Sequence, residues 1–101
     1  MKLRKVVDGD LKVLPEYVFW CPVCYAEHGV NFEKEPRWIL VRGGLERPTL
    51  NPSVRVRFMK TDGVAVNCHL KVEDGILKYQ EDCSHHMRGQ DVDMQDMDDV
   101  V

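Results

Sequence analysis

The stretch VRVRFMKTDGVAVNCHLKVEDGILKYQ, residues 54–80, contains three runs rich in β-branched and aromatic side chains. Thr61-Asp62-Gly63 separates the first two runs, and Asp74-Gly75 separates the second run from the third. Asp and Gly both tolerate positive φ, so an Asp-Gly pair between such runs indicates a β-hairpin. The stretch therefore predicts two consecutive hairpins.

The same pattern continues toward the N-terminus, where short apolar runs are interrupted by turn residues. These runs are KLRKVV, LKVL, YVFW, VNF and RWILV. Only the segment SHHMRGQ near the end is compatible with a single helical turn. We therefore expect an all-β fold, a small sandwich or open barrel. A chain of 101 residues predicts one domain, which we place at residues 1–94, followed by an acidic tail at 95–101.

Composition excludes several classes of protein. Hydrophobic residues make up 44% and charged residues 31%, as in ordinary globular domains. No apolar run is long enough to span a bilayer, and the N-terminal stretch lacks the apolar core of a secretory signal, so we expect a cytoplasmic protein without a membrane partner. Residues 1–60 carry 11 basic and 7 acidic side chains, residues 61–101 carry 3 and 10, and the pI near 5.7 argues against nucleic-acid binding.

The motif Cys21-Pro22-Val23-Cys24 directs two sulfurs to one side of a tight turn and predicts a metal site. A redox role is disfavoured, because such a pair usually opens a helix in a βαβ unit. The candidates for the remaining ligands are Cys68, His69, Cys83, His85, His86 and His28. We expect zinc bound by the four cysteines, because this set uses every thiol in the chain.

Strand geometry separates two of these candidates. Cys68 and His69 are neighbours on an expected strand, so their side chains face opposite sides of the sheet. If Cys68 binds the metal, His69 is available for another task. The alternative is a catalytic metal held by Cys21, Cys24 and one histidine, His69 or His85, with an open position for water. Neither an H-E-x-x-H nor an H-x-E pattern supports that alternative.

A second group of residues has the composition of a nucleophile and its base. Ser53 lies in RPTLNPS, where two prolines stiffen the backbone. A serine beside an imidazole that a third polar group orients is the minimum arrangement for nucleophilic catalysis. We expect Ser53 to attack and His69 to take its proton. His85 or Asp82 would orient the base, and His85 is also a candidate for binding the oxyanion.

The order of the motifs resembles that of a known family. CPVC, Trp38, RPTLNPS, the C-H and D-G-x-I blocks, D-C-x-H and a final Gly-Gln pair follow one another between about residue 20 and residue 94. This order is similar to that of small phage and prophage proteins that form a domain of unknown function, often mislabelled as ammonia monooxygenases. The chain departs from the family pattern at Arg88, where Ala is usual, and at Gly43-Gly44-Leu45, where Asn-Gly is common.

The resemblance implies a function. Relatives occur in bacterial operons for ubiquitin-like proteins and their conjugating enzymes, where they are proposed to be peptidases that trim or remove the ubiquitin-like protein. The residues to which it assigns roles are Ser53, His69 and His85 for catalysis and Cys21 and Cys24 for metal binding. We expect a zinc-containing peptidase or esterase acting on a protein or peptide, with a ubiquitin-like protein as the candidate substrate. The alternative is a non-catalytic, zinc-stabilised phage accessory or binding module.

Overall fold

The computed structural model describes residues 1–10 and 12–97, and the described residues form strands, turns and loops without a helix. The strands are β1 (Arg4–Lys5), β2 (Tyr17–Cys21), β3 (Ala26–Val30), β4 (Ile39–Arg42), β5 (Thr49–Asn51), β6 (Val54–Met59), β7 (Ala65–Glu73), β8 (Ile76–Tyr79) and β9 (Asp91–Asp93). The all-β prediction is confirmed.

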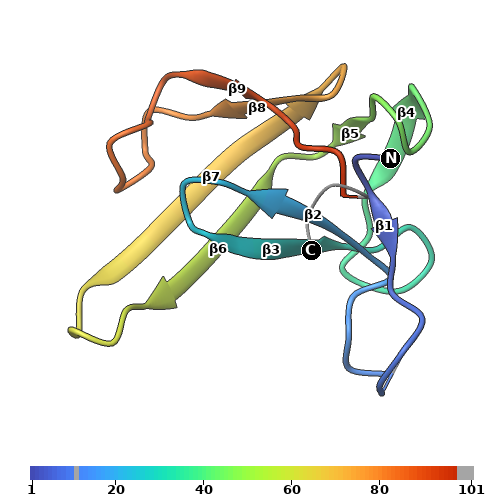
Figure 1. The fold of residues 1–101 in the computed structure, drawn as a ribbon, viewed down its shortest axis with the longest axis horizontal. Helices are drawn as coiled ribbons and strands as arrows, with labels where there is room; N and C mark the ends of the chain where they lie inside the picture. The colour runs from blue at the N-terminus through green and yellow to red at the C-terminus, as the bar shows by residue number, and fades with distance from the viewer. Residues whose placement is uncertain (11, 98–101) are drawn as a thin grey trace.

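The strands form three small antiparallel sheets, and none of them closes into a barrel. Their strand orders are β1-β2-β3, β4-β5 and β6-β7-β8-β9. The long β6–β7 hairpin crosses the molecule, and the β2–β3 hairpin lies near its centre (Figure 1). Within each sheet, every strand pairs with the strand that follows it in the sequence, because the connections are short and the strands have complementary apolar faces.

The two hairpins that residues 54–80 predict are both present. β6 pairs with β7 from Val54↔Leu70 to Met59↔Ala65, and β7 pairs with β8 from Leu70↔Tyr79 to Glu73↔Ile76. Asp74 and Gly75 connect β7 to β8 with φ values of 51° and 75°. Positive φ at both central residues is the geometry that a two-residue hairpin turn requires.

Elsewhere the boundaries differ from the expected runs. Lys12, Val13 and Leu14 lie in a turn, not a strand, and Leu11 lies outside the described residues. SHHMRGQ forms turns without a helix. The short strands β5 and β9 have too few residues for a recognisable alternation, and β3 carries His28 and Gly29 where a strand normally has apolar side chains.

The three sheets contribute to one apolar core. Its buried members include Phe19 and Val30 from the first sheet, Leu50 from the second, and Leu70 and Leu77 from the third. On β6 and β7 the inward side chains alternate with outward polar ones. This alternation gives the third sheet a buried inner face and a polar outer face, and the two faces carry different chemistry.

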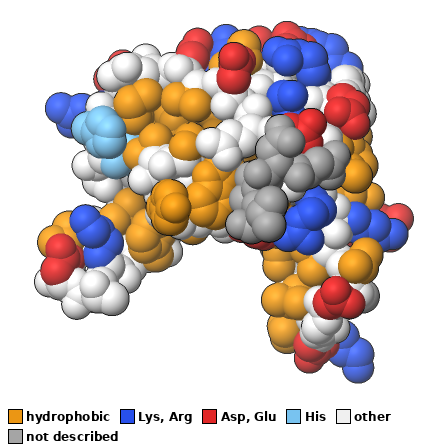
Figure 2. Space-filling view, viewed as in Figure 1, with side chains coloured by type: hydrophobic (Ala, Val, Ile, Leu, Met, Phe, Trp, Pro, Cys, Tyr) orange, Lys and Arg blue, Asp and Glu red, His pale blue; other side chains and the backbone are white. Residues whose placement is uncertain are grey.

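Two projections extend from the body (Figures 1 and 2). One is the turn end of the β6–β7 hairpin, where Met59 and Val64 are exposed, and the other is the loop between β1 and β2, where Val7 and Val13 are exposed. The described part of the chain includes no helix with the length and apolar character needed to cross a membrane.

The first residues of the expected acidic tail pack against the N-terminus. Met97 is buried and its N–H donates to the carbonyl of Met1 at 2.7 Å. The ammonium group of Met1 donates to Asp96 Oδ1 at 2.6 Å. Residues 98–101 of the expected tail lie outside the described residues.

Candidate active site and metal cluster

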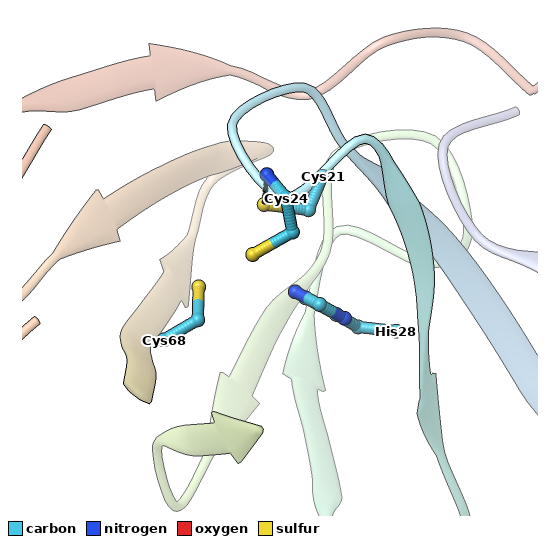
Figure 3. Close-up of side chains that lie close together, drawn as sticks. All are labelled: Cys21, Cys24, His28 and Cys68. Carbon is cyan, nitrogen blue, oxygen red and sulfur yellow. Dashed lines mark hydrogen bonds between the residues drawn. The ribbon is translucent and has the colours of Figure 1, made fainter. Parts of the chain in front are cut away.

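Three cysteines and one histidine meet on the buried side of the molecule. The ligand atoms of this cluster lie within 4.8 Å of one another, and its members are Cys21, Cys24, His28 and Cys68. In Figure 3 the sulfurs of Cys24 and Cys68 and the imidazole of His28 point toward a common centre. We call this group the Cys3His cluster.

The β2–β3 hairpin and β7 position the Cys3His cluster. Cys21 ends β2, and its sulfur accepts the N–H of Cys24 at 3.5 Å across the turn. His28 pairs with Phe19, two residues before Cys21, so the period of two places Cys21 and His28 on the same face. Cys68 approaches from β7, also from its buried face. Two sequence-distant segments therefore meet at one point.

The donor set fits a metal ion. Nε2 of His28 is buried and makes no hydrogen bond among the described residues, which is costly unless another partner is present. The Cys24 thiol lowers the pKa of Cys21, and the same contact raises the pKa of Cys24 to about 12. Contact with Cys21 also raises the pKa of Cys68. Without a cation, the three sulfurs cannot readily all be thiolates, whereas a divalent ion would stabilise all three.

The cluster differs from the expected four-cysteine set at one position. Cys83 is buried beside the backbone of His69, where its sulfur accepts the His69 N–H at 3.2 Å and donates to the His69 carbonyl at 2.9 Å. His28 completes the cluster in its place. His28 lies four residues after Cys24 and is one of the candidate ligands that the sequence offers, whereas the preference for Cys83 rests only on the number of thiols.

On the outer face of the third sheet, three polar side chains form a hydrogen-bonded series. Ser53 Oγ lies 2.8 Å from Nε2 of His69, and Nδ1 of His69 lies 2.8 Å from Oδ1 of Asp82. Ser53 immediately precedes β6, His69 lies on β7, and Asp82 lies in the turn after β8. The contacts span 16 and 13 residues of sequence, so tertiary folding creates the series.

The Asp82 carboxylate determines which ring nitrogen of His69 donates a hydrogen bond and which one accepts. Its hydrogen bond with His69 lowers the pKa of Asp82, and Arg55 adds to the effect. Asp82 is therefore ionised at neutral pH and can only accept hydrogen bonds. Nδ1 of His69 must donate to it, which leaves Nε2 as an acceptor for the Ser53 hydroxyl.

Packing around Ser53 holds its backbone in place. The indole N–H of Trp38 donates to the Ser53 carbonyl at 3.2 Å. A hollow of about 260 Å³ opens beside Ser53, and its lining residues are Arg42, Thr49, Leu50, Asn51, Lys71, Val72 and Glu73. Ser53 is therefore one of the residues that line a space large enough for a substrate group.

His85 contacts a different group of residues. Its Nε2 lies 3.4 Å from the sulfur of Cys68, and its ring packs edge-on against Tyr79 with 4.9 Å between ring centroids. Burial lowers the pKa of His85. The structure therefore brings Ser53 and His69 together with Asp82, and it places His85 beside the Cys3His cluster. The Tyr79 hydroxyl lies 3.0 Å from the sulfur of Cys21 and supports the same cluster.

Fold and site together define a small all-β protein with the serine, histidine and carboxylate arrangement that serine hydrolases use. Comparison with family models gives the particular family. The model of BubE, described as the bacterial ubiquitination-like system serine protease, matches residues 3–80. The match covers most of the 101 residues, and the chain belongs to this family.

The family assignment confirms the expected relationship to peptidases of ubiquitin-like systems. The match contains Ser53, His69 and all four residues of the Cys3His cluster, whereas Asp82 lies two residues beyond it. Comparisons with curated proteins and with solved structures give no match.

Proposed function

We propose that this protein is a serine peptidase of a bacterial ubiquitin-like conjugation system, with Ser53 as nucleophile, His69 as base and Asp82 as the carboxylate that orients the base. The observation that carries the proposal is the hydrogen-bonded series from Ser53 Oγ through both ring nitrogens of His69 to Asp82 Oδ1. The family description supports the same reaction class. Asp82 takes the role that the sequence had left open between His85 and Asp82.

The proposed chemistry follows from the order of these groups. The Ser53 oxygen attacks the carbonyl carbon of the scissile bond while Nε2 of His69 takes the hydroxyl proton. The imidazolium then gives this proton to the departing amine, and an acyl group remains on Ser53. Water, deprotonated by His69, releases the acyl group as a carboxylate. Asp82 stabilises the imidazolium in both steps.

We also propose that Cys21, Cys24, His28 and Cys68 hold zinc in a structural role. When bound, zinc would supply a tetrahedral crosslink between the β2–β3 hairpin and β7. Four protein ligands complete this coordination, whereas catalytic zinc sites keep one position for water. His69 engages Ser53 and Asp82 instead of the cluster, which argues against the alternative of a metal-activated nucleophile.

The proposed substrate is a ubiquitin-like protein cleaved at its C-terminal extension. A flexible terminal segment presents an accessible peptide bond to a shallow site on a sheet face. The hollow beside Ser53 would receive a side chain or backbone segment of this extension.

The serine mechanism is tested with a fluorophosphonate probe and with a ubiquitin-like precursor from the same operon. The chain contains only two serines, Ser53 and Ser84, which makes the control simple. Ser53→Ala should lose both labelling and cleavage, whereas Ser84→Ala should still be labelled. Normal cleavage by Ser53→Ala would exclude the serine mechanism. A folded wild-type protein that neither takes the label nor cleaves would favour the non-catalytic binding module.

A further inference from the structure

Arg55 lies beside the proposed catalytic residues on the same face of the sheet. On β6 it pairs in register with His69, and the alternation of the strand puts it on the side opposite the buried Val54. Its Nη2 lies 2.5 Å from Oδ2 of Asp82 and 3.2 Å from Nδ1 of His69. The two oxygens of Asp82 are therefore divided: Oδ1 faces His69 and Oδ2 faces Arg55.

The backbone of Asp82 is already anchored without Arg55. Asn67 Nδ2 donates to the Asp82 carbonyl at 2.8 Å. The next residues also bind β7: the Cys83 thiol bridges the N–H and the carbonyl of His69, and Ser84 exchanges hydrogen bonds with the backbone of Asn67. These contacts hold the turn against the strand, but they do not fix the orientation of the Asp82 carboxylate.

The carboxylate itself is poorly enclosed. The Asp82 side chain is 50% exposed and therefore has room to rotate about its two side-chain bonds. Rotation would break the contact between Oδ1 and the His69 ring. Arg55, which extends from the regular strand β6, engages the second oxygen and opposes this rotation.

We propose that Arg55 is a positioning residue of the active site, holding the Asp82 carboxylate in the orientation that keeps His69 aligned with Ser53. This role rests on the proposed serine mechanism. An exposed ion pair of this kind contributes only about 0–1 kcal/mol to folding. The effect of Arg55 is therefore on turnover: a base that is misaligned for part of the time lowers the fraction of productive complexes.

Arg57 provides a matched control for Arg55. Both arginines are exposed and lie on the outer face of β6, two positions apart. Arg57 donates from Nε to Asn67 Oδ1 at 3.4 Å, and among the described residues it makes no hydrogen bond or ion pair with Ser53, His69 or Asp82. Arg55→Ala and Arg57→Ala therefore remove the same charge and nearly the same packing from one strand face.

The experiment measures kcat and KM of the full chain on a short activated ester, together with melting temperatures. Arg55→Ala should lower kcat by about 10–100-fold, less than the roughly 10⁴-fold loss known for a disabled triad carboxylate. KM should stay within about twofold, because Arg55 is assigned no contact with substrate. Arg57→Ala should resemble wild type in both constants.

Added methylguanidinium gives a readout that a purely structural role would not change. Because the Arg55 side chain is exposed, its deletion leaves a site that a small guanidinium ion can enter beside Asp82. Methylguanidinium should restore part of kcat in Arg55→Ala. It should have no such effect on Arg57→Ala or on Asp82→Asn, which removes the anion that binds the added ion.

The outcomes separate the inference from the mechanism on which it rests. If Ser53→Ala retains full turnover, both the serine mechanism and the role of Arg55 are wrong. If turnover requires Ser53 but Arg55→Ala has the kcat of Arg57→Ala, only the positioning role is wrong. A fall in kcat that follows a lower melting temperature and does not respond to methylguanidinium would also overturn the positioning role.

Discussion

Cys68 and His69 are consecutive residues of β7 whose side chains lie on opposite faces of the sheet. Cys68 is fully buried within the Cys3His cluster, whereas His69 lies on the outer face between Ser53 and Asp82. One peptide unit therefore links the proposed metal site to the proposed base. We therefore expect that changes to the metal ligands lower the stability of the fold directly and affect catalysis only indirectly, by disturbing β7.

Metal content should distinguish the two four-ligand sets. We expect Cys83→Ser to retain one metal ion per chain and His28→Ala to lose it, because His28 belongs to the cluster and Cys83 binds the backbone of His69. Elemental analysis of purified variants checks this. Retention by His28→Ala together with loss by Cys83→Ser would support the four-cysteine set instead.

Removal of the metal should destabilise the fold. The cluster joins the β2–β3 hairpin to β7, and metal binding contributes several kcal/mol to folding in small domains. Each kcal/mol lowers the melting temperature of a domain of this size by about 4–8 °C. Thermal unfolding with and without a strong chelator measures the effect, and added zinc should reverse it. An unchanged melting temperature after verified metal removal would exclude a structural role.

Asp82 and His85 should differ in their effects on turnover. Asp82→Asn replaces a charged group that only accepts hydrogen bonds with an amide that can also donate, so it no longer selects the His69 tautomer and should lower kcat by about 10³–10⁴-fold. His85→Gln should have a much smaller effect, because His85 contacts Cys68 and Tyr79. Steady-state kinetics on the same ester compares the two variants. A larger loss in His85→Gln would restore the initial assignment of His85 as a catalytic residue.

The Cys83 thiol should stabilise the strand that carries His69. Cys83→Ala leaves the part-buried His69 N–H without the sulfur acceptor, and the loss should lie at or below the roughly 1–3 kcal/mol that a fully buried unsatisfied donor costs. Cys83→Ser keeps a donor and an acceptor, so its loss of unfolding free energy should be smaller. Denaturant unfolding of both variants checks the order. Equal losses would mean that thiol packing outweighs its hydrogen bonds.

Glu16 should make stability depend on pH in the acid range. Its carboxylate accepts the backbone N–H groups of Phe32, Glu33 and Lys34, with the Lys34 contact the largest cause of its lowered pKa. A carboxyl whose pKa is lower in the folded state stabilises the fold above its ordinary pKa of 4.5 and loses this contribution as pH falls through the folded value.

The comparison for Glu16 is between wild type and Glu16→Gln. Their difference in unfolding free energy should be constant near neutral pH and should shrink below about pH 4.5. Denaturant unfolding at several pH values measures it. A difference that grows toward acid pH would contradict the assignment.

Much of the site follows from local rules. The alternation of β7 separates Cys68 from His69, and the spacing of Cys21 and Cys24 directs both sulfurs to one centre. The Ser53–His69 contact was also expected, although only folding brings the two residues to 2.8 Å. Cys83 and His85 contact other residues than the sequence predicts. Both follow β8 in a segment of turns, where side chains lack the regular alternation of a strand.

The all-β class, the hairpin turns and the opposite faces of Cys68 and His69 can all be predicted from the sequence, since these features depend on neighbouring residues and on the period of the strand. The place of His28 in the Cys3His cluster and the contact between Asp82 and His69 become known only from the folded chain. The position of His28 beside Cys68 depends on the packing of the β2–β3 hairpin against β7. The contact between Asp82 and His69 depends on the turn after β8, which binds Asn67 and His69 of β7 through Cys83 and Ser84. Its docked conformation brings together side chains whose sequence separation leaves their relative positions open.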